Sequence, residues 1–208
     1  MSGYFQTRYS YDKGRAVVWR AISEYLQREV PEDATVLELG CGYCDFINQI
    51  RAAVKYALDV DASAGDHCAP DVKFLHASAL EIPLPSKSVD LIFASNLLEH
   101  FDDSTLVKLM PQIHASLRPR GRLMLIQPNY FYAYREYWDD YTHKKAFTHS
   151  SLNDFLVANG FRIRTIEPRF LPISFKSRAP RSYWLTWLYL RAPWRPGAKQ
   201  MLVVAETD

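Results

Sequence analysis

Residues 35–45 read Thr-Val-Leu-Glu-Leu-Gly-Cys-Gly-Tyr-Cys-Asp, a short apolar run that is followed by two closely spaced glycines. Such a run is typical of a buried strand that turns sharply into the next element. Apolar residues then recur at helical spacing, at Phe46, Ile47, Ile50 and Val54. The stretch therefore predicts a strand, a glycine turn and a helix, which is a building unit of open α/β sheets.

The same alternation continues through most of the chain. Apolar runs predict further strands at residues 56–60, 72–76, 89–94, 121–126, 161–166 and 201–205. Helical spacing of apolar residues, or a capping residue, predicts helices at residues 15–29, 104–117 (with Pro111 inside) and 148–160. Strands that alternate with helices predict a doubly wound, Rossmann-like α/β fold whose sheet is largely parallel.

The length of 208 residues suits one domain, which we expect to span residues 1–208. Within it we expect a covering helix in residues 1–34, an acceptor-site segment at 127–147 and an aromatic, basic insertion at 170–196 between the last two strands. The formal net charge of +2 says little about partners.

The cellular compartment is expected to be cytoplasmic. Residues 1–13 contain no apolar run of the kind found in a secretory signal, and no stretch approaches the roughly 20 apolar residues that span a bilayer. The three cysteines are too few, and odd in number, for a disulfide framework.

The glycine turn is the expected ligand site, because ligands of such sheets bind beyond the carboxyl ends of the strands. Asp59 ends the second strand, where an acid can accept hydrogen bonds from ribose hydroxyls. Glu38 would repel a pyrophosphate but suits a ligand with an ammonium and a sulfonium group. The third glycine of the dinucleotide fingerprint is missing, since positions 44 and 45 are Cys and Asp. Both facts favour S-adenosylmethionine over NAD.

Five stretches resemble, in order and spacing, the successive motifs of class I S-adenosylmethionine-dependent methyltransferases of the small-molecule and glycan type. They are Val36–Gly42, Ala57–Asp61, Ala77–Pro83, Val89–His100 and Leu117–Gly121. The resemblance covers about residues 36 to 126 and implies a seven-stranded sheet with an antiparallel last strand.

The resemblance also implies the residues that hold the cofactor. Glu38 would serve the methionine amine, Asp59 the ribose, and Ser78 with Ala79 the adenine edge. The full set of cofactor-binding residues is Glu38, Gly40, Cys41, Gly42, Tyr43, Asp59, Val60, Ser78, Ala79, Leu80 and Ser95. The family usually has a small residue at position 44 and often Asp at 78. The neutral Ser78 should therefore bind the adenine amino group more weakly than a carboxylate.

Methyl transfer to a hydroxyl needs positioning and removal of a proton. His100, after the fourth strand, and His143 are the candidate bases, and Asp140, three residues before His143, would orient its imidazole. The motif Asn96-x-x-Glu99-His100 resembles a metal-binding set of some quinone-pathway relatives. Since Asn96 stands where those relatives have an acid, no metal is predicted.

The aromatic segment 128–138 is the expected acceptor wall, with Asn129, Tyr130, Tyr134 and Arg135 as candidate substrate-binding residues. An aromatic loop that only packs over the sheet edge is the competing interpretation. Residues 139–161 resemble methyltransferases of bacterial glycan and secondary-metabolite assembly, which favours an oxygen acceptor on a small molecule, sugar or glycolipid. The Asn/Asp-Pro-Pro-Tyr/Phe signature of amino-group methylation is absent after the fourth strand, so no nucleic-acid acceptor is expected.

Further hypotheses stay open at this point. The pair Cys41-x-x-Cys44 would suit a dithiol redox protein, and the domain would also suit non-catalytic binding of the cofactor or a partner. The insertion 170–196 would form a lid, a homodimer interface or a peripheral membrane contact.

Overall fold

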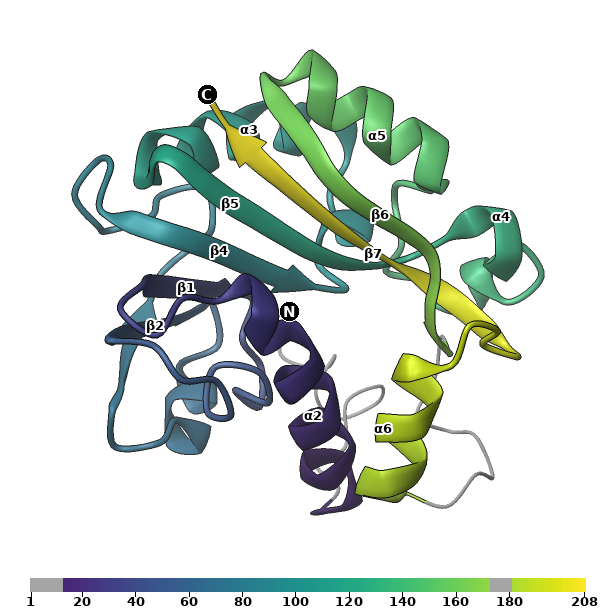
Figure 1. The fold of residues 1–208 in the computed structure, drawn as a ribbon. Coiled ribbons are helices and arrows are strands. Elements are labelled where there is room, and N and C mark those ends of the chain that lie inside the picture. Colours follow the sequence, from purple (N-terminus) through teal and green to yellow (C-terminus); the bar gives the residue numbers. More distant parts are fainter. Residues whose placement is uncertain (1–12, 173–180) are drawn as a thin grey trace.

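A seven-stranded sheet forms the centre of the computed structural model, which describes residues 13–172 and 181–208 (Figure 1). The strands lie side by side in the order β3-β2-β1-β4-β5-β7-β6. Their bounds are β1 Thr35–Leu39, β2 Val54–Asp59, β3 Val72–His76, β4 Val89–Ser95, β5 Leu117–Pro128, β6 Phe161–Pro172 and β7 Ala198–Thr207.

Strands β1 to β5 pair in parallel, and β7 is antiparallel to both of its neighbours, β5 and β6. The strand order reverses between β1 and β4, so the chain leaves the ends of these two strands in opposite directions and opens a crevice there. The predicted fold class, a mostly parallel Rossmann-like sheet with an antiparallel last strand, is confirmed.

Helices cover the two faces of the sheet. Helices α3 and α5 lie on one face and helices α2 and α6 on the other (Figure 1). The α-helices are α2 Lys13–Leu26, α3 Asp103–Ser116, α4 Tyr130–Ala133, α5 His149–Ala158 and α6 Tyr183–Arg191. Short 3-10 helices are η1 Gln27–Glu29, η2 Ala62–His67, η3 Leu98–His100 and η4 Tyr137–Asp139.

Successive residues of the central strands point to opposite faces of the sheet and pack into two different hydrophobic cores. In β4, Phe93 packs with Trp19 and Phe46 on the α2 side, whereas Ile92 joins the core that includes Leu106 of α3. This double burial is the reason that the central strands appear in the sequence as continuous apolar runs.

The helix predicted after the glycine turn does not form. Phe46, Ile47 and Ile50 are buried as the spacing requires, but the chain from 42 to 49 runs in turns and Val54 already opens β2. The Glu38 carboxylate accepts the Ile47 amide at 3.0 Å. That amide is therefore not available to a regular helical ladder.

The insertion predicted at 170–196 begins inside the sheet, because β6 continues to Pro172. Residues 173–180 of this insertion, including Arg178, and residues 1–12 of the predicted N-terminal segment lie outside the described residues. Within the rest of the insertion, residues 183–191 form α6, which packs beside α2 (Figure 1). Arg195 ties this region together, since it pairs with Glu167 of β6 at 2.6 Å and donates to the Tyr25 hydroxyl at 3.1 Å.

Helix α6 buries only one side. Leu190 is fully buried, whereas Trp184, Leu185 and Leu188 are 68%, 50% and 58% exposed. In the part of the chain that the structure describes, no helix has the length and apolar character needed to cross a membrane. Trp184, Leu185 and Leu188 form an exposed apolar surface on a helix that packs beside α2.

Candidate active site at the carboxyl ends of the strands

The glycine loop after β1 is held against the end of β2. The amides of Gly40 and Cys41 both donate to the Leu58 carbonyl, at 2.8 and 3.2 Å. Gly40 and Gly42 have positive φ angles of 65° and 50°, which a glycine adopts without strain. A Cβ at Gly40 would also lie 3.0 Å from Cδ1 of Leu97, so a side chain there would be crowded.

Asp59 links the ends of β1 and β2. One carboxylate oxygen accepts the Gly42 amide at 2.9 Å, and the other accepts the Asp61 amide at 2.9 Å. A carboxylate has about four acceptor positions, so these two bonds leave capacity for two hydroxyl donors. The side chain is thus both a support for the loop and a group suited to a ribose.

Glu38 lies at the carboxyl end of β1 and is 4% exposed. Burial raises the pKa of Glu38 well above its ordinary value, and the nearby Cys44, Asp45 and Asp59 raise it further, against the Ile47 amide that lowers it. A cation beside this carboxyl group would strongly stabilise its charged form, and the carboxylate would in turn bind the cation.

The other predicted cofactor residues follow β2, β3 and β4 at the same edge of the sheet. Val60 is 69% exposed and Ala79 is buried. The Ala77 amide donates to the Asp59 carbonyl at 3.1 Å, which fixes the loop that carries Ser78 beside the end of β2. Ser95 receives a hydrogen bond from Asn96 at 3.1 Å. Strands β1 to β4 thus bring their carboxyl-end residues to one edge, as the parallel pairing requires.

The cysteines lie beneath this loop. Cys41 and Cys44 are 5% and 0% exposed, and the sulfurs of Cys44 and Cys68 are 3.2 Å apart. A hydrogen bond from Cys41 lowers the pKa of Cys44. Dithiol exchange requires an accessible thiolate, so the burial of both motif cysteines does not suit a redox module.

His100 and His143 meet at the same end of the sheet, with ring centroids 5.2 Å apart. The Lys144 and Lys145 amides donate to the Glu99 carbonyl at 2.7 and 3.1 Å. These two bonds hold the segment after β5 against η3, and they bring together two histidines that lie far apart in the sequence.

Hydrogen bonds orient both imidazoles. Nδ1 of His143 lies 2.7 Å from the Tyr137 carbonyl, which can only accept, so this nitrogen carries the proton in the neutral ring. Nδ1 of His100 lies 3.0 Å from the Thr142 hydroxyl, which itself donates to Asp140 at 2.6 Å. Asp140 is therefore connected to His100 through Thr142, and the Tyr137 carbonyl takes the orienting position beside His143 that the sequence spacing assigned to Asp140.

Glu99 is a functional candidate that is not among the site residues expected from the sequence. It is 2% exposed, and its carboxylate oxygens make no hydrogen bond to another described residue. Burial raises the pKa of Glu99 to about 8, with its own amide lowering and Asp140 raising it. Burial, together with the neighbouring His143, lowers the pKa of His100. One carboxylate oxygen of Glu99 and one nitrogen from each histidine lie within 4.8 Å of one another.

Of the predicted acceptor residues, Asn129 and Tyr130 are wholly or partly buried, whereas Tyr134 and Arg135 are exposed. Asn129 is fully buried, and its side chain donates to the Pro168 carbonyl at 2.9 Å and caps α4, which suits a supporting role. Tyr130 contacts the buried Tyr137, with ring centroids 5.2 Å apart. Tyr134 and Arg135 are exposed and contact each other, with 3.1 Å between Arg135 Nε and the Tyr134 hydroxyl.

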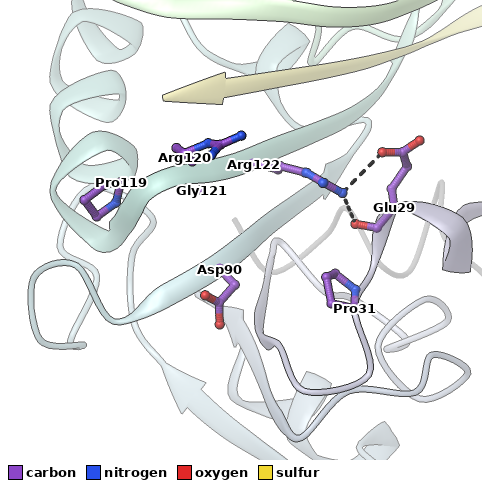
Figure 2. A pocket seen from close by; sticks show the side chains of 7 residues that line it. All are labelled: Glu29, Pro31, Asp90, Pro119, Arg120, Gly121 and Arg122. Carbon is purple, nitrogen blue, oxygen red and sulfur yellow. Dashed lines mark hydrogen bonds and ion pairs between the residues drawn. The ribbon is translucent and has the colours of Figure 1, made fainter. Parts of the chain in front are cut away.

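A separate surface depression lies at the opposite edge of the sheet, where the strands begin (Figure 2). Glu29 and Arg122 form one side, and Arg122 Nη1 donates to the Glu29 carbonyl at 2.9 Å. Asp90, near the start of β4, also lines it. Because ligands of these sheets bind at the carboxyl ends of the strands, this depression is not the candidate active site.

Comparison with known proteins identifies the family of the chain. The protein family described as a methyltransferase domain matches residues 11–166, which include the glycine loop, the histidine cluster and six of the seven strands in whole or in part. The chain belongs to this family of class I S-adenosylmethionine-dependent methyltransferases. The cofactor of the methyltransferase is S-adenosylmethionine.

The curated relatives are similar to this methyltransferase over different lengths of the chain. An uncharacterised protein of Methanocaldococcus jannaschii is 27% identical over 169 residues, which cover 79% of this chain and 72% of the relative. A "Probable S-adenosylmethionine-dependent methyltransferase" of Mycobacterium tuberculosis is 35% identical over 101 residues, which cover 45% of this chain and 35% of the relative. The match therefore spans about a third of the mycobacterial protein.

Solved structures share the fold. A methyltransferase described as SAM-dependent, from Archaeoglobus fulgidus, superposes with a TM-score of 0.66 at 20% identity, over 98% of this chain and 97% of the other. One from Thermotoga maritima superposes with a TM-score of 0.68 at 15% identity, over 99% and 93%. At such identities the likeness shows the fold of the methyltransferase and not its acceptor.

Proposed function

We propose that the methyltransferase transfers the methyl group of S-adenosylmethionine to a hydroxyl oxygen of a small molecule, a sugar or a glycolipid. The observation that carries this proposal is the pairing of His100 and His143 at the cofactor edge of the sheet, with both Nδ1 atoms used to orient the rings. In each neutral ring the lone pair is then on Nε2, where it can accept the proton of a hydroxyl.

The reaction is an in-line displacement. A lone pair of the acceptor oxygen forms the new O–CH3 bond while the S–CH3 bond breaks, and its electron pair stays on sulfur to give S-adenosylhomocysteine. The hydroxyl proton leaves the acceptor, and an imidazole Nε2 of His100 or His143 is the group proposed to take it. Positioning of the oxygen against the methyl group supplies much of the acceleration in such a reaction.

The cofactor would lie along the carboxyl ends of β1, β2 and β4. Glu38 would bind the ammonium group, Asp59 the ribose hydroxyls, and the loop with Ser78 and Ala79 the adenine. Val60 and Leu80 would pack on the adenine ring, and Ser95 would close the site at the end of β4. Tyr130, Tyr134 and Arg135 are the proposed acceptor contacts, and Asn129 would support them through its bond to Pro168.

An acceptor screen with methyl-labelled cofactor tests this proposal. We expect label in sugars, phenols or lipid-linked sugars that carry a free hydroxyl, and no label in the same compounds after that hydroxyl is blocked. Transfer to amine acceptors or to nucleic acid, with none to hydroxyl compounds, would contradict an oxygen acceptor.

Cofactor binding is expected to release a proton from Glu38. Before the cofactor binds, the raised pKa keeps this carboxyl group protonated at pH values above 4.5, the ordinary pKa of a glutamic acid side chain. The ammonium of the cofactor favours the carboxylate and so lowers the pKa of Glu38 in the complex. Affinity should therefore rise with pH between the pKa of the complex and the raised pKa of the free protein, and then level off. Calorimetry in two buffers of different ionisation enthalpy measures the released proton.

The variant Glu38→Gln should bind without this proton release, while the matched variant Glu81→Gln, changed at an exposed position, should behave like the wild type. Equal proton release by Glu38→Gln and the wild type would show that another group titrates.

A lipid-linked acceptor is favoured by the surface of α6. Trp184, Leu185 and Leu188 are exposed there, and the exposed Arg181 and Arg191 flank them. Aromatic and aliphatic side chains beside arginines suit the headgroup region of an anionic bilayer. We therefore propose an anionic membrane surface as the contact of this helix face.

Flotation with vesicles that contain an anionic lipid should recover the wild type, and neutral vesicles should recover less of it. Trp184→Ala with Leu188→Ala should lose the anionic binding, and Val157→Ala, at an exposed site of α5, should keep it. No lipid-dependent recovery, together with a mass that rises with concentration, would assign the α6 face to a second copy of the chain.

A further inference from the structure

Glu99 and its two histidines have the composition of a metal centre. The three side chains each offer one ligand atom, and these atoms lie within 4.8 Å of one another. Two imidazoles and one carboxylate form a ligand set that binds divalent transition ions such as Zn²⁺ and leaves a coordination position for a substrate oxygen.

The buried carboxylate is the independent sign of a missing partner. Glu99 is 2% exposed, and neither of its oxygens makes a hydrogen bond to another described residue. A buried carboxyl group without a hydrogen-bond partner is costly in its neutral form and more so in its charged form, and most buried polar groups in native proteins are satisfied by a partner. A cation between Glu99 and the histidines would supply that partner.

The surrounding hydrogen bonds match those that orient metal-binding histidines. The Tyr137 carbonyl accepts Nδ1–H of His143, and Thr142 connects Nδ1–H of His100 to the Asp140 carboxylate. Such bonds fix the tautomer that presents the Nε2 lone pair and increase the basicity of the ligand.

We infer that Glu99, His100 and His143 form a binding site for a divalent transition-metal ion. The sequence predicts no metal, because Asn96 stands in place of an acid. In the fold, His143 of the segment after β5 takes part in the cluster, so the set does not need position 96. The inference rests on the proposed function only for the use of the ion. A bound ion would occupy the imidazole lone pairs, so it would replace the imidazoles as the group that promotes loss of the acceptor proton, by holding the acceptor oxygen and lowering the pKa of its hydroxyl.

Titration of metal-free full-length protein with Co²⁺ tests the site without cofactor or acceptor, by calorimetry and by the visible absorption of the bound ion. We expect one ion per chain. His143→Ala and Glu99→Gln should each weaken binding by about 100-fold, and Thr142→Val, which changes only the support of His100, by about 10-fold. His76→Ala, at an exposed histidine outside the cluster, should bind as the wild type.

Calorimetry with S-adenosylmethionine on the same proteins reports whether each variant is folded, and Glu99→Gln retains the shape of a buried side chain. No stoichiometric Co²⁺ binding by the wild type would overturn the inference. Binding that is equal in His143→Ala, Glu99→Gln and His76→Ala would overturn it as well, because the ion would then lie elsewhere. Cobalt binding without transfer to any hydroxyl acceptor would leave the metal site standing and would contradict the proposed oxygen acceptor.

Discussion

The variant Asp59→Asn is expected to bind S-adenosylmethionine about 100-fold more weakly than the wild type, because two charge-assisted hydrogen bonds to ribose hydroxyls are together worth about 3 kcal/mol. The loss should appear in the dissociation constant measured by calorimetry. The carboxamide that replaces the carboxylate would keep one oxygen as an acceptor for the Gly42 or Asp61 amide, so part of the loop support is retained.

Asp61→Asn is the matched control for this prediction. Asp61 lies two positions further along the chain, and its side chain is bonded to Ser63 at the start of η2. This control should bind the cofactor as the wild type does. Thermal unfolding of both variants separates a loss of binding from a loss of fold. Cofactor affinity of Asp59→Asn within about threefold of the wild type would show that the ribose is bound elsewhere.

The second large effect is expected for His143→Ala, which should lower turnover by about 100-fold or more, the usual contribution of a positioned group in proton transfer. His143 lies against His100 and is oriented by the Tyr137 carbonyl, so its removal deletes one of the two nitrogens proposed to face the acceptor. Cofactor affinity should stay close to that of the wild type, because the cofactor groups lie on other strands. Single-turnover rates with an acceptor from the screen give the chemical step directly.

His76→Ala controls for the loss of a histidine outside the cluster and should keep full turnover. His100→Ala should resemble His143→Ala, since both rings belong to one cluster. Full activity in His100→Ala and His143→Ala would assign proton removal to solvent or to another residue, and would remove the main support for a hydroxyl acceptor.

Much of the sheet is predictable from the sequence because buried parallel strands are continuous apolar runs. Strand β3 has the predicted bounds, 72–76, and β1, at 35–39, is the apolar run that precedes the two glycines. Strands β5, β6 and β7 are longer than predicted, since their ends contain charged residues such as Arg118 and Arg169 that apolar patterning excludes. Hydrogen bonds between strands decide these ends, and they are not visible in a local window.

The helix predicted after the glycine loop shows why local spacing can mislead. The apolar residues 46, 47 and 50 are buried as a helix would bury them, but the carboxylate of Glu38 takes the amide of Ile47. Spacing indicates which residues face the core. It does not indicate which backbone amide a side chain from a preceding strand will bind.

The acceptor side was less predictable than the cofactor side. The proposed cofactor residues follow consecutive strands, so their meeting at one edge follows from the topology. The contact between Glu99, His100 and His143 depends on a crossing of the segment after β5 over η3, which two backbone hydrogen bonds fix. Two features of the sequence indicate the histidines of this cluster: the Glu-His pair after a strand and the Asp-x-x-His spacing. The hydrogen bonds by which Thr142 connects His100 to Asp140 are visible only in the folded chain.

Calorimetry with S-adenosylmethionine, S-adenosylhomocysteine and NAD on the wild-type protein tests the central claim most directly, because Glu38, the glycine loop and Asp59 are together proposed to select the cofactor. We expect one molecule of S-adenosylmethionine or of S-adenosylhomocysteine to bind per chain, each displacing the other, and we expect no measurable binding of NAD. Binding of NAD without binding of the two sulfur compounds would contradict the account.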